Sequence, residues 1–421
     1  MDTLKKYQIF FFFLLLFITL IIFLPAIDAK YAGIDDWILL KSYSGALKRI
    51  SLDYVINTFK NYHGGLYHPL VTLSYSLEIT ICGFLPALFH FDNILLHMIN
   101  VLLVFIIFIN LSKSFWLSFI ITALFAIHPT RVEVVAWISA RKDLLYAFFY
   151  LLSVLFYIKS YDTDKSKQYI TLSIIMFLLS CFSKSMSITL PFALILIDLY
   201  TKNFSTKKIK IYLLYILITM IFMFITINSH YDIDDTYFCF TKFNHAINFI
   251  NAHFNILFYF DKLLLPINLY CMYPFFYDNF SMPPNFILYS PAVLYLLIFF
   301  SFLSLKKTKV IFFGFIFFLI SIFPVSSIFP IGDFAVADRY TYIPYLGLFF
   351  IFAKFILYIC NKTSKVINIL IFCLCIIVFA ELCYLSHNRV IDWKYNRYNA
   401  PHSMKYYEFG IKKNYLTEKF L

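Results

Sequence analysis

Long apolar runs separated by short polar segments are the dominant pattern of this chain. The first run, Gln8 to Ile27, has the length of about 20 residues that a helix needs to cross the roughly 30 Å core of a bilayer. It is long for the apolar region of a signal peptide, and the residues before Lys30 make a poor cleavage site, so a spanning helix is favoured. Further runs cover residues 90–110, 114–127, 143–159, 168–183, 186–200, 209–228, 289–305, 309–328, 341–360 and 366–385, which predicts about eleven transmembrane helices.

Composition agrees with this pattern. Of the 421 residues, 62% are hydrophobic and only 14% are charged, which excludes an ordinary soluble domain. We therefore expect an all-α polytopic membrane protein. The net charge of +12 would raise the question of nucleic acid in a soluble protein, but the lysines are dispersed between the apolar runs and form no single basic face. No nucleic-acid partner is expected.

The positively charged residues divide between the two faces of the predicted membrane protein. Alternating the chain across the bilayer puts most lysines on the side of the N-terminus, which the positive-inside rule makes cytoplasmic. The arginines fall on the outer side, where longer loops are expected to carry short interfacial helices. Because a guanidinium group binds phosphate in two places, this predicts an anionic ligand there; alternatively, longer loops simply hold more polar residues of every kind. The arginines are Arg49, Arg131, Arg141, Arg339, Arg389 and Arg397.

A pair of adjacent carboxylates, Asp35 and Asp36, follows the first apolar run. Two neighbouring carboxylates repel each other and bind water strongly, so they are poorly suited to anchoring a helix in lipid. A carboxylate held at the membrane edge can act as a general base or help to bind a divalent cation. The alternative is a solvated turn in which Trp37 anchors the loop to the interface.

The second polar motif runs from His128 to Asp143, where charged ends surround an apolar middle that contains Trp137. Pro129 favours the start of a helix, so we expect a short helix at the membrane interface. Either the cation at its far end, Arg141, contacts phosphate, or the segment is a surface helix whose long cations extend towards water.

The residues of this motif and of three later segments occur together in a known family. They are His128, Pro129, Glu133, Trp137, Arg141 and Asp143, then Ser183-Lys184 with Thr189-Leu190-Pro191, Leu265-Pro266 with Tyr273-Pro274, and Asp338-Arg339-Tyr340 with Pro344 and Gly347. The chain thereby resembles the protein O-mannosyltransferase-like membrane glycosyltransferases of the GT-C superfamily, which commonly continue into tetratricopeptide repeats. The resemblance implies a GT-C type fold and a polyprenyl-phosphate sugar as the donor.

The resemblance also implies roles for the charged residues. Asp35 is expected to be the base that takes the acceptor proton, with Asp36 orienting it or sharing a metal ion, although the order of the two could be reversed. Arg339 is the expected clamp on the donor phosphate, supported by Arg141 and Lys184. Some GT-C enzymes need a divalent cation; without a third obvious carboxylate ligand the sequence favours metal independence, and no metal ligand is assigned.

Five further residues of the motifs are expected to support this site. Asp338 and Tyr340 flank the predicted phosphate clamp, and His128 and Glu133 would orient the sugar or the loop. His68 lies in the first outer loop. A single histidine at a helix end is weak evidence, because such residues are more often hydrogen-bonded structural groups than ligands.

The expected reaction is therefore transfer of a hexose such as mannose to an acceptor hydroxyl, either of protein Ser or Thr or of a glycolipid. A transporter or an inactive scaffold is the alternative from another class. We expect a glycosyltransferase domain over residues 1–385, a short polar tail over 386–421, and a location in a bacterial plasma membrane with the active site outside. The tail is too short for two tetratricopeptide repeats of about 34 residues each.

Overall fold

The computed structural model describes residues 2–32, 36, 50–62, 66–161, 163–231, 245–271, 273, 285–328 and 335–397. All eleven apolar runs form helices, which confirms the all-α polytopic membrane fold. No strand ladder occurs among the described residues, in which Tyr273 and Val336 form an isolated antiparallel bridge. The helices are α1 (Asp2–Phe23), α5 (Pro86–Ser112), α6 (Phe115–Ile127), α8 (Arg141–Lys159), α9 (Ser166–Cys181), α10 (Leu190–Thr201), α11 (Ile209–Tyr231), α14 (Ser290–Ser304), α15 (Val310–Ile322), α16 (Tyr345–Lys362) and α17 (Lys365–Lys394).

The helices differ in whether they are long enough to span a bilayer. Within the described residues, five are long and apolar enough to cross a membrane, or six if the bent pair formed by α6 and the segment after it counts as one span. Helices α9, α10 and α14 have only 16, 12 and 15 residues. A straight span needs about 20 residues. Several of the eleven expected spans are therefore too short to cross a bilayer as single straight helices.

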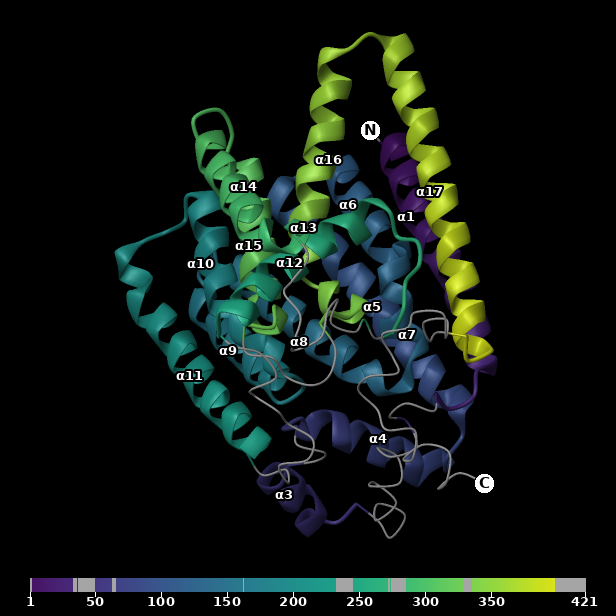
Figure 1. The fold of residues 1–421 in the computed structure, drawn as a ribbon, viewed down its shortest axis with the longest axis vertical. Coiled ribbons are helices and arrows are strands. Elements are labelled where there is room, and N and C mark those ends of the chain that lie inside the picture. Colours follow the sequence, from purple (N-terminus) through teal and green to yellow (C-terminus); the bar gives the residue numbers. More distant parts are fainter. Residues whose placement is uncertain are drawn as a thin grey trace.

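The two ends of the helix bundle differ in character (Figure 1). The N-terminus lies towards one end, together with the α14–α15 and α16–α17 turns, which carry Lys306, Lys307, Lys362 and Lys365. At the other end, α3 (Leu52–Lys60) and α4 (Pro69–Cys82) lie across the bundle. The lysine-bearing turns and the α3–α4 segment therefore lie at opposite ends of the bundle. That the lysine-bearing end faces the cytoplasm stays a prediction.

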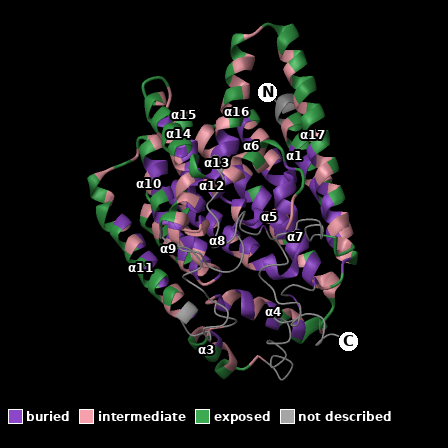
Figure 2. Cartoon of the chain, in the orientation of Figure 1, coloured by how far each residue is buried: buried purple, intermediate pink, exposed green. Residues whose placement is uncertain are grey.

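Burial increases towards α5 and α8, which pack against each other in the middle of the bundle (Figure 2). The peripheral helices α11, α14 and α17 instead expose apolar side chains such as Leu217, Phe300 and Ile377. Exposed apolar surface on this scale is what lipid contact requires. Helix α17 continues to Lys394, past the predicted domain end at residue 385. Its last turns pack against the rest of the protein, since Ser386, Arg389 and Trp393 are buried. The division at 385 stays a prediction.

Helix α12 (His245–Leu264) was not predicted, because it lies in what the apolar pattern treats as an outer loop. Its asparagines point inwards: Asn248, Asn251 and Asn255 are all buried. The Asn255 side chain donates to the Ala335 carbonyl at 3.0 Å and to the Ser326 carbonyl at 3.3 Å. A helix that uses amides to hold a neighbouring loop lacks the apolar run by which spans are recognised.

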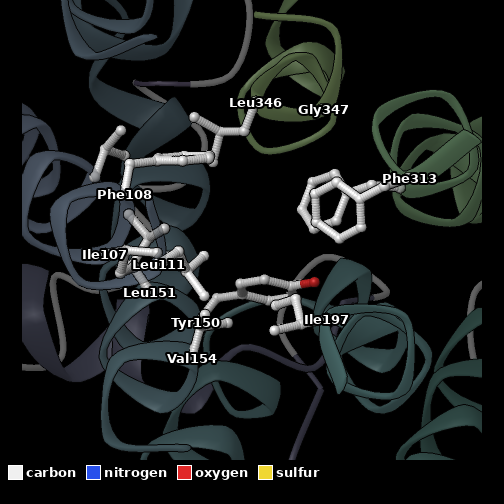
Figure 3. A pocket seen from close by; sticks show the side chains of 12 residues that line it. Ile107, Phe108, Leu111, Tyr150, Leu151, Val154, Ile197, Phe313, Leu346 and Gly347 are labelled. Atoms are coloured by element: carbon white, nitrogen blue, oxygen red, sulfur yellow. The ribbon is translucent and has the colours of Figure 1, made fainter. Parts of the chain in front are cut away.

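An apolar pocket lies between α5, α8, α10, α15 and α16 (Figure 3). It is lined by Phe108, Tyr150 and Phe313 among others, and by Gly347 at the crossing of α15 and α16. At that crossing a Cβ atom added to Gly347 would lie 2.2 Å from the Gly314 carbonyl oxygen, and one added to Gly314 would lie 2.3 Å from the Gly347 oxygen. Only glycine lets the two backbones approach this closely.

Replacing Gly347 with alanine is therefore expected to separate α15 from α16. Overpacking typically costs about 1–3 kcal/mol, so the melting temperature of the detergent-solubilised protein should fall by several degrees, and Gly314→Ala should behave alike. Ile377→Ala, at a side chain that is 65% exposed, is the control. Unchanged melting of both glycine variants would contradict the close crossing.

Candidate active site

The segment that follows α6 is folded into the protein interior. The chain bends by 55° after α6 and forms three short turns, η3 (Pro129–Arg131), α7 (Val132–Ala136) and η4 (Ile138–Ala140). His128 starts the first turn, where its Nδ1 accepts from the Thr130 backbone N–H at 3.4 Å. A helix begins at Pro129 as expected, and residues 128–141 are buried throughout, so the segment is packed inside the protein and is not an exposed surface helix.

Glu133 on α7 binds the segment before α16 through an ion pair. Its Oε1 accepts from Nη1 of Arg339 at 2.5 Å, and its Oε2 accepts from the Arg339 backbone N–H at 3.0 Å. Arg339 also lies over the Trp137 ring, with Cζ 5.2 Å from the ring centroid. Burial alone would lower the pKa of Arg339, but the adjacent Glu133 carboxylate raises it above its ordinary value. Arg339 is therefore a permanent cation held by a carboxylate and an aromatic face.

The neighbouring residue, Asp338, is held by a second buried pair. Its Oδ2 accepts from Arg389 Nη2 at 2.7 Å, and the Tyr273 hydroxyl lies 3.2 Å from both carboxylate oxygens. Burial raises the pKa of Asp338, while Arg389 opposes that rise. Arg389, on α17, also donates to the Pro129 carbonyl at 2.8 Å. Sequence reasoning assigned Arg389 no role beyond its place among the outer arginines.

Arg141 begins α8 and is surrounded by acceptors. Its Nε donates to Asn93 Oδ1 at 2.9 Å, its Nη2 donates to the Phe89 carbonyl at 2.9 Å, and its Nη1 forms an ion pair with Glu78. Its guanidinium also lies 4.6 Å from the centroid of the Tyr75 ring. The phosphate contact predicted for Arg141 stays a prediction, and all three of its nitrogens already donate to the protein. Glu78 on α4 and Asn93 on α5 were not predicted as site residues, because the residues around them in these helices are mostly apolar.

Lys184 lies in the turn between α9 and η5 (Ser185–Thr189) and faces α8. Its Nζ donates to Asp143 Oδ1 at 2.5 Å and lies 5.3 Å from the centroid of the Tyr340 ring. Arg339 Cζ lies 5.0 Å from the same ring, so Tyr340 contacts both cations. Burial lowers the pKa of Lys184 to about 8, against the opposing attraction of Asp143. The structure thus brings together two of the three predicted phosphate-binding residues.

Asp36 connects the first loop to the same region. Its Oδ2 accepts from the Ala32 backbone N–H at 2.8 Å, and its Oδ1 accepts from the Ser139 backbone N–H at 2.9 Å as well as from the Ser139 hydroxyl. Ser139 lies in η4, two residues before Arg141. Asp36 is therefore attached to the turn that leads into α8. Asp35 lies outside the described residues.

The remaining predicted residues, His128 and His68, are buried structural neighbours of this site. His128 Nε2 lies 3.2 Å from the Leu263 carbonyl at the end of α12. His68 precedes α4, and the Leu70 backbone N–H donates to the Phe182 carbonyl at 3.3 Å, which places the start of α4 beside the Lys184 turn. The described residues contain no group of three or more His, Cys, Asp or Glu side chains that could hold a metal ion. Metal dependence stays a prediction.

Comparison with known proteins agrees with the resemblance read from the motifs. No family model matches the chain. It is 30% identical over 154 residues to "Protein O-mannosyl-transferase TMTC1" of Mus musculus, 37% over 97 residues to the protein of that name in Homo sapiens, and 40% over 98 residues to "Protein O-mannosyl-transferase TMTC2" of Homo sapiens. These alignments cover 34%, 23% and 23% of this chain and 16%, 11% and 12% of the relatives. The similarity is therefore to a small part of each relative.

The buried Glu133–Arg339 pair is open to a direct test. Removing one charge from a buried pair typically costs about 3–5 kcal/mol, because the remaining charge is left without a partner. Glu133→Gln and Arg339→Met should each lower the melting temperature of the detergent-solubilised protein. The double variant Glu133→Gln/Arg339→Met should be more stable than the sum of the single effects implies. Strict additivity would show that the two charges do not interact.

Proposed function

We propose that this chain is a membrane glycosyltransferase. It moves a hexose such as mannose from a polyprenyl-phosphate donor to an acceptor hydroxyl, and the acceptor is a Ser or Thr of a protein. The observation that carries this proposal is the similarity to several curated proteins named protein O-mannosyl-transferase. The buried cation cluster formed by Arg339 and Lys184 around Tyr340 supports it, because cations that face a departing phosphate stabilise its negative charge.

The proposed chemistry is a single displacement. The acceptor oxygen attacks the anomeric carbon, its proton passes to a carboxylate, and the bond from the anomeric carbon to the phosphate oxygen breaks, so the configuration at that carbon inverts. We assign the base to Asp35 and the orienting role to Asp36. The hydrogen bonds from Ala32 and Ser139 occupy oxygens on both sides of the Asp36 carboxylate, which suits an anchor better than a base.

Phosphate binding is assigned to Arg339 and Lys184, with Arg141 in a supporting role. An ammonium group has three N–H donors, and Lys184 uses one of them on Asp143. Arg141 uses three of its five N–H groups on protein acceptors, and its side chain is only 1% exposed, so a phosphate would have to enter the protein interior to reach it. Glu133 and Asp338 then act by holding Arg339 and its segment in place. His128, His68 and Tyr340 complete the supporting set.

We further propose that the protein lies in a bacterial plasma membrane with its N-terminus in the cytoplasm. The active site then faces outwards, at the end of the bundle opposite the lysine-bearing turns. The transferase domain covers residues 1–385 in this proposal, with the last turns of α17 packed against it. The donor's polyprenyl chain would remain in the bilayer while its phosphate reaches the site from the membrane edge.

The proposal predicts sugar transfer by membranes that contain the protein. Given a radiolabelled polyprenyl-phosphate mannose, wild-type membranes should transfer label to protein, and Asp35→Asn should lower the rate by at least about 100-fold, since a positioned base contributes about 10²–10⁴-fold. Ser139→Ala, which removes one hydrogen bond to Asp36 and no carboxylate, is the matched control and should retain most activity.

Separating the labelled products identifies the acceptor class. Label in lipid instead of protein would establish the glycolipid alternative. Equal rates for wild type and Asp35→Asn would remove Asp35 from the reaction, and a larger loss in Asp36→Asn would reverse the two roles. Absence of transfer from several polyprenyl-phosphate sugars would leave the transporter and scaffold alternatives.

A further inference from the structure

Asp143 is a buried carboxylate of the site that the proposed reaction has not yet used. It lies in the first turn of α8 and its side chain is fully buried. One oxygen, Oδ1, accepts from Lys184 Nζ, whereas the other, Oδ2, has no hydrogen-bond partner among the described residues. A buried carboxylate oxygen without a donor is costly, because it loses its hydrogen bonds to water and gains none in return. The position therefore calls for a reason beyond packing.

The cation that Asp143 holds differs from the arginines of the site. The Lys184 side chain is 13% exposed, so it reaches the edge of the buried cluster. Within the described part of the chain, Asp143 is the only acceptor that Lys184 Nζ contacts, and the Tyr146 and Tyr340 rings lie beside it. Two of its three N–H groups therefore remain for a ligand.

We infer that Asp143 is a positioning residue for the donor: it holds the Lys184 ammonium as a cation between α8, the α9–η5 turn and η8 (Asp338–Thr341), with two N–H groups left for a phosphate oxygen. This inference rests on the proposed function, because it names the group that prepares the same site for a polyprenyl-phosphate ligand. Asp143 acts through Lys184 and touches no reacting atom.

The surroundings of Lys184 show why it needs such a partner. Lys142 on α8 and Arg339 on η8 both repel its charge, and burial disfavours the charged form. Asp143 is the carboxylate that opposes these effects, because Glu133 is already paired with Arg339. Two tyrosine rings also face Lys184, with the centroids of Tyr146 and Tyr340 lying 5.7 and 5.3 Å from Nζ, and His68 precedes α4, whose first turn contacts the same α9–η5 turn. Without Asp143, Lys184 would lose its proton at a lower pH.

The pH dependence has a definite sign. Because burial lowers the pKa of Lys184 to about 8, the lysine is charged below that pH and becomes neutral above it. Binding of a phosphodiester donor, whose single negative charge does not change between pH 6 and 9, should therefore weaken as the pH rises through about 8. Asp143→Asn keeps the shape and the Oδ1 acceptor but removes the charge, so this weakening should begin at a lower pH.

The experiment measures binding of polyprenyl-phosphate mannose to purified full-length protein in lipid nanodiscs from pH 6 to pH 9. If loss of the carboxylate lowers the Lys184 pKa by one unit, the charged fraction at pH 8 falls from about one half to about one eleventh. Asp143→Asn should then bind the donor about fivefold more weakly than wild type at pH 8, with a smaller difference at pH 6. Lys184→Arg should lose the alkaline decline, since arginine stays charged over this range. In transfer assays the change should appear in KM for the donor more than in kcat.

A matched variant separates this role from a structural one. Asp198 is also buried and paired with a lysine, Lys208 at 3.1 Å, but lies towards the far end of α10. Asp198→Asn should lower stability and leave the pH profile of donor binding unchanged. If Asp143→Asn behaves like Asp198→Asn, the inference is overturned, and so it is if wild-type binding shows no alkaline decline. Donor binding with the expected profile but no sugar transfer would refute the proposed function alone.

Discussion

The ion pair between Glu133 and Arg339 is the interaction on which the rest of the site depends. One carboxylate binds both the side chain and the backbone N–H of Arg339, across 206 residues of sequence. This contact joins the short turns after α6 to the segment that leads into α16. A charge buried in an apolar bundle is tolerated only when a partner compensates it. The pair therefore fixes where these two segments can meet.

Three further ion pairs, buried or nearly so, follow the same constraint. Arg389 holds Asp338, Glu78 holds Arg141, and Asp143 holds Lys184. Only 14% of the chain is charged, yet these four pairs place eight charged side chains inside the described part of the bundle. Buried charges in membrane proteins are costly and often mark functional sites, which is why we propose the reaction centre in this part of the bundle.

The cations of these pairs differ in their exposure and in how many protein groups they contact. This difference decides the roles that we propose for them. All three nitrogens of Arg141 donate to the protein, so its position between α4 and α5 is fixed. Lys184 reaches the edge of the cluster and donates to a single carboxylate. The motifs alone grouped these two residues as phosphate contacts. Side-chain exposure and the number of protein acceptors, which only the three-dimensional arrangement reveals, distinguish a residue that holds the site from one that can bind a ligand.

The sequence by itself determined the membrane fold and the positions of the eleven apolar helices, and it indicated the residues around which we propose the site. These follow from local patterns. A span needs a continuous apolar run, and a charged residue among apolar runs is rare enough to indicate a function. Only the tertiary structure decided that residues 128–141 are buried, that α12 points its asparagines inwards, and that Asn93, Glu78 and Arg389 join the site. The reason is physical, since partners such as Ser139 and Asp36 lie 103 residues apart. Their pairing is set by packing in three dimensions, which no local periodicity records.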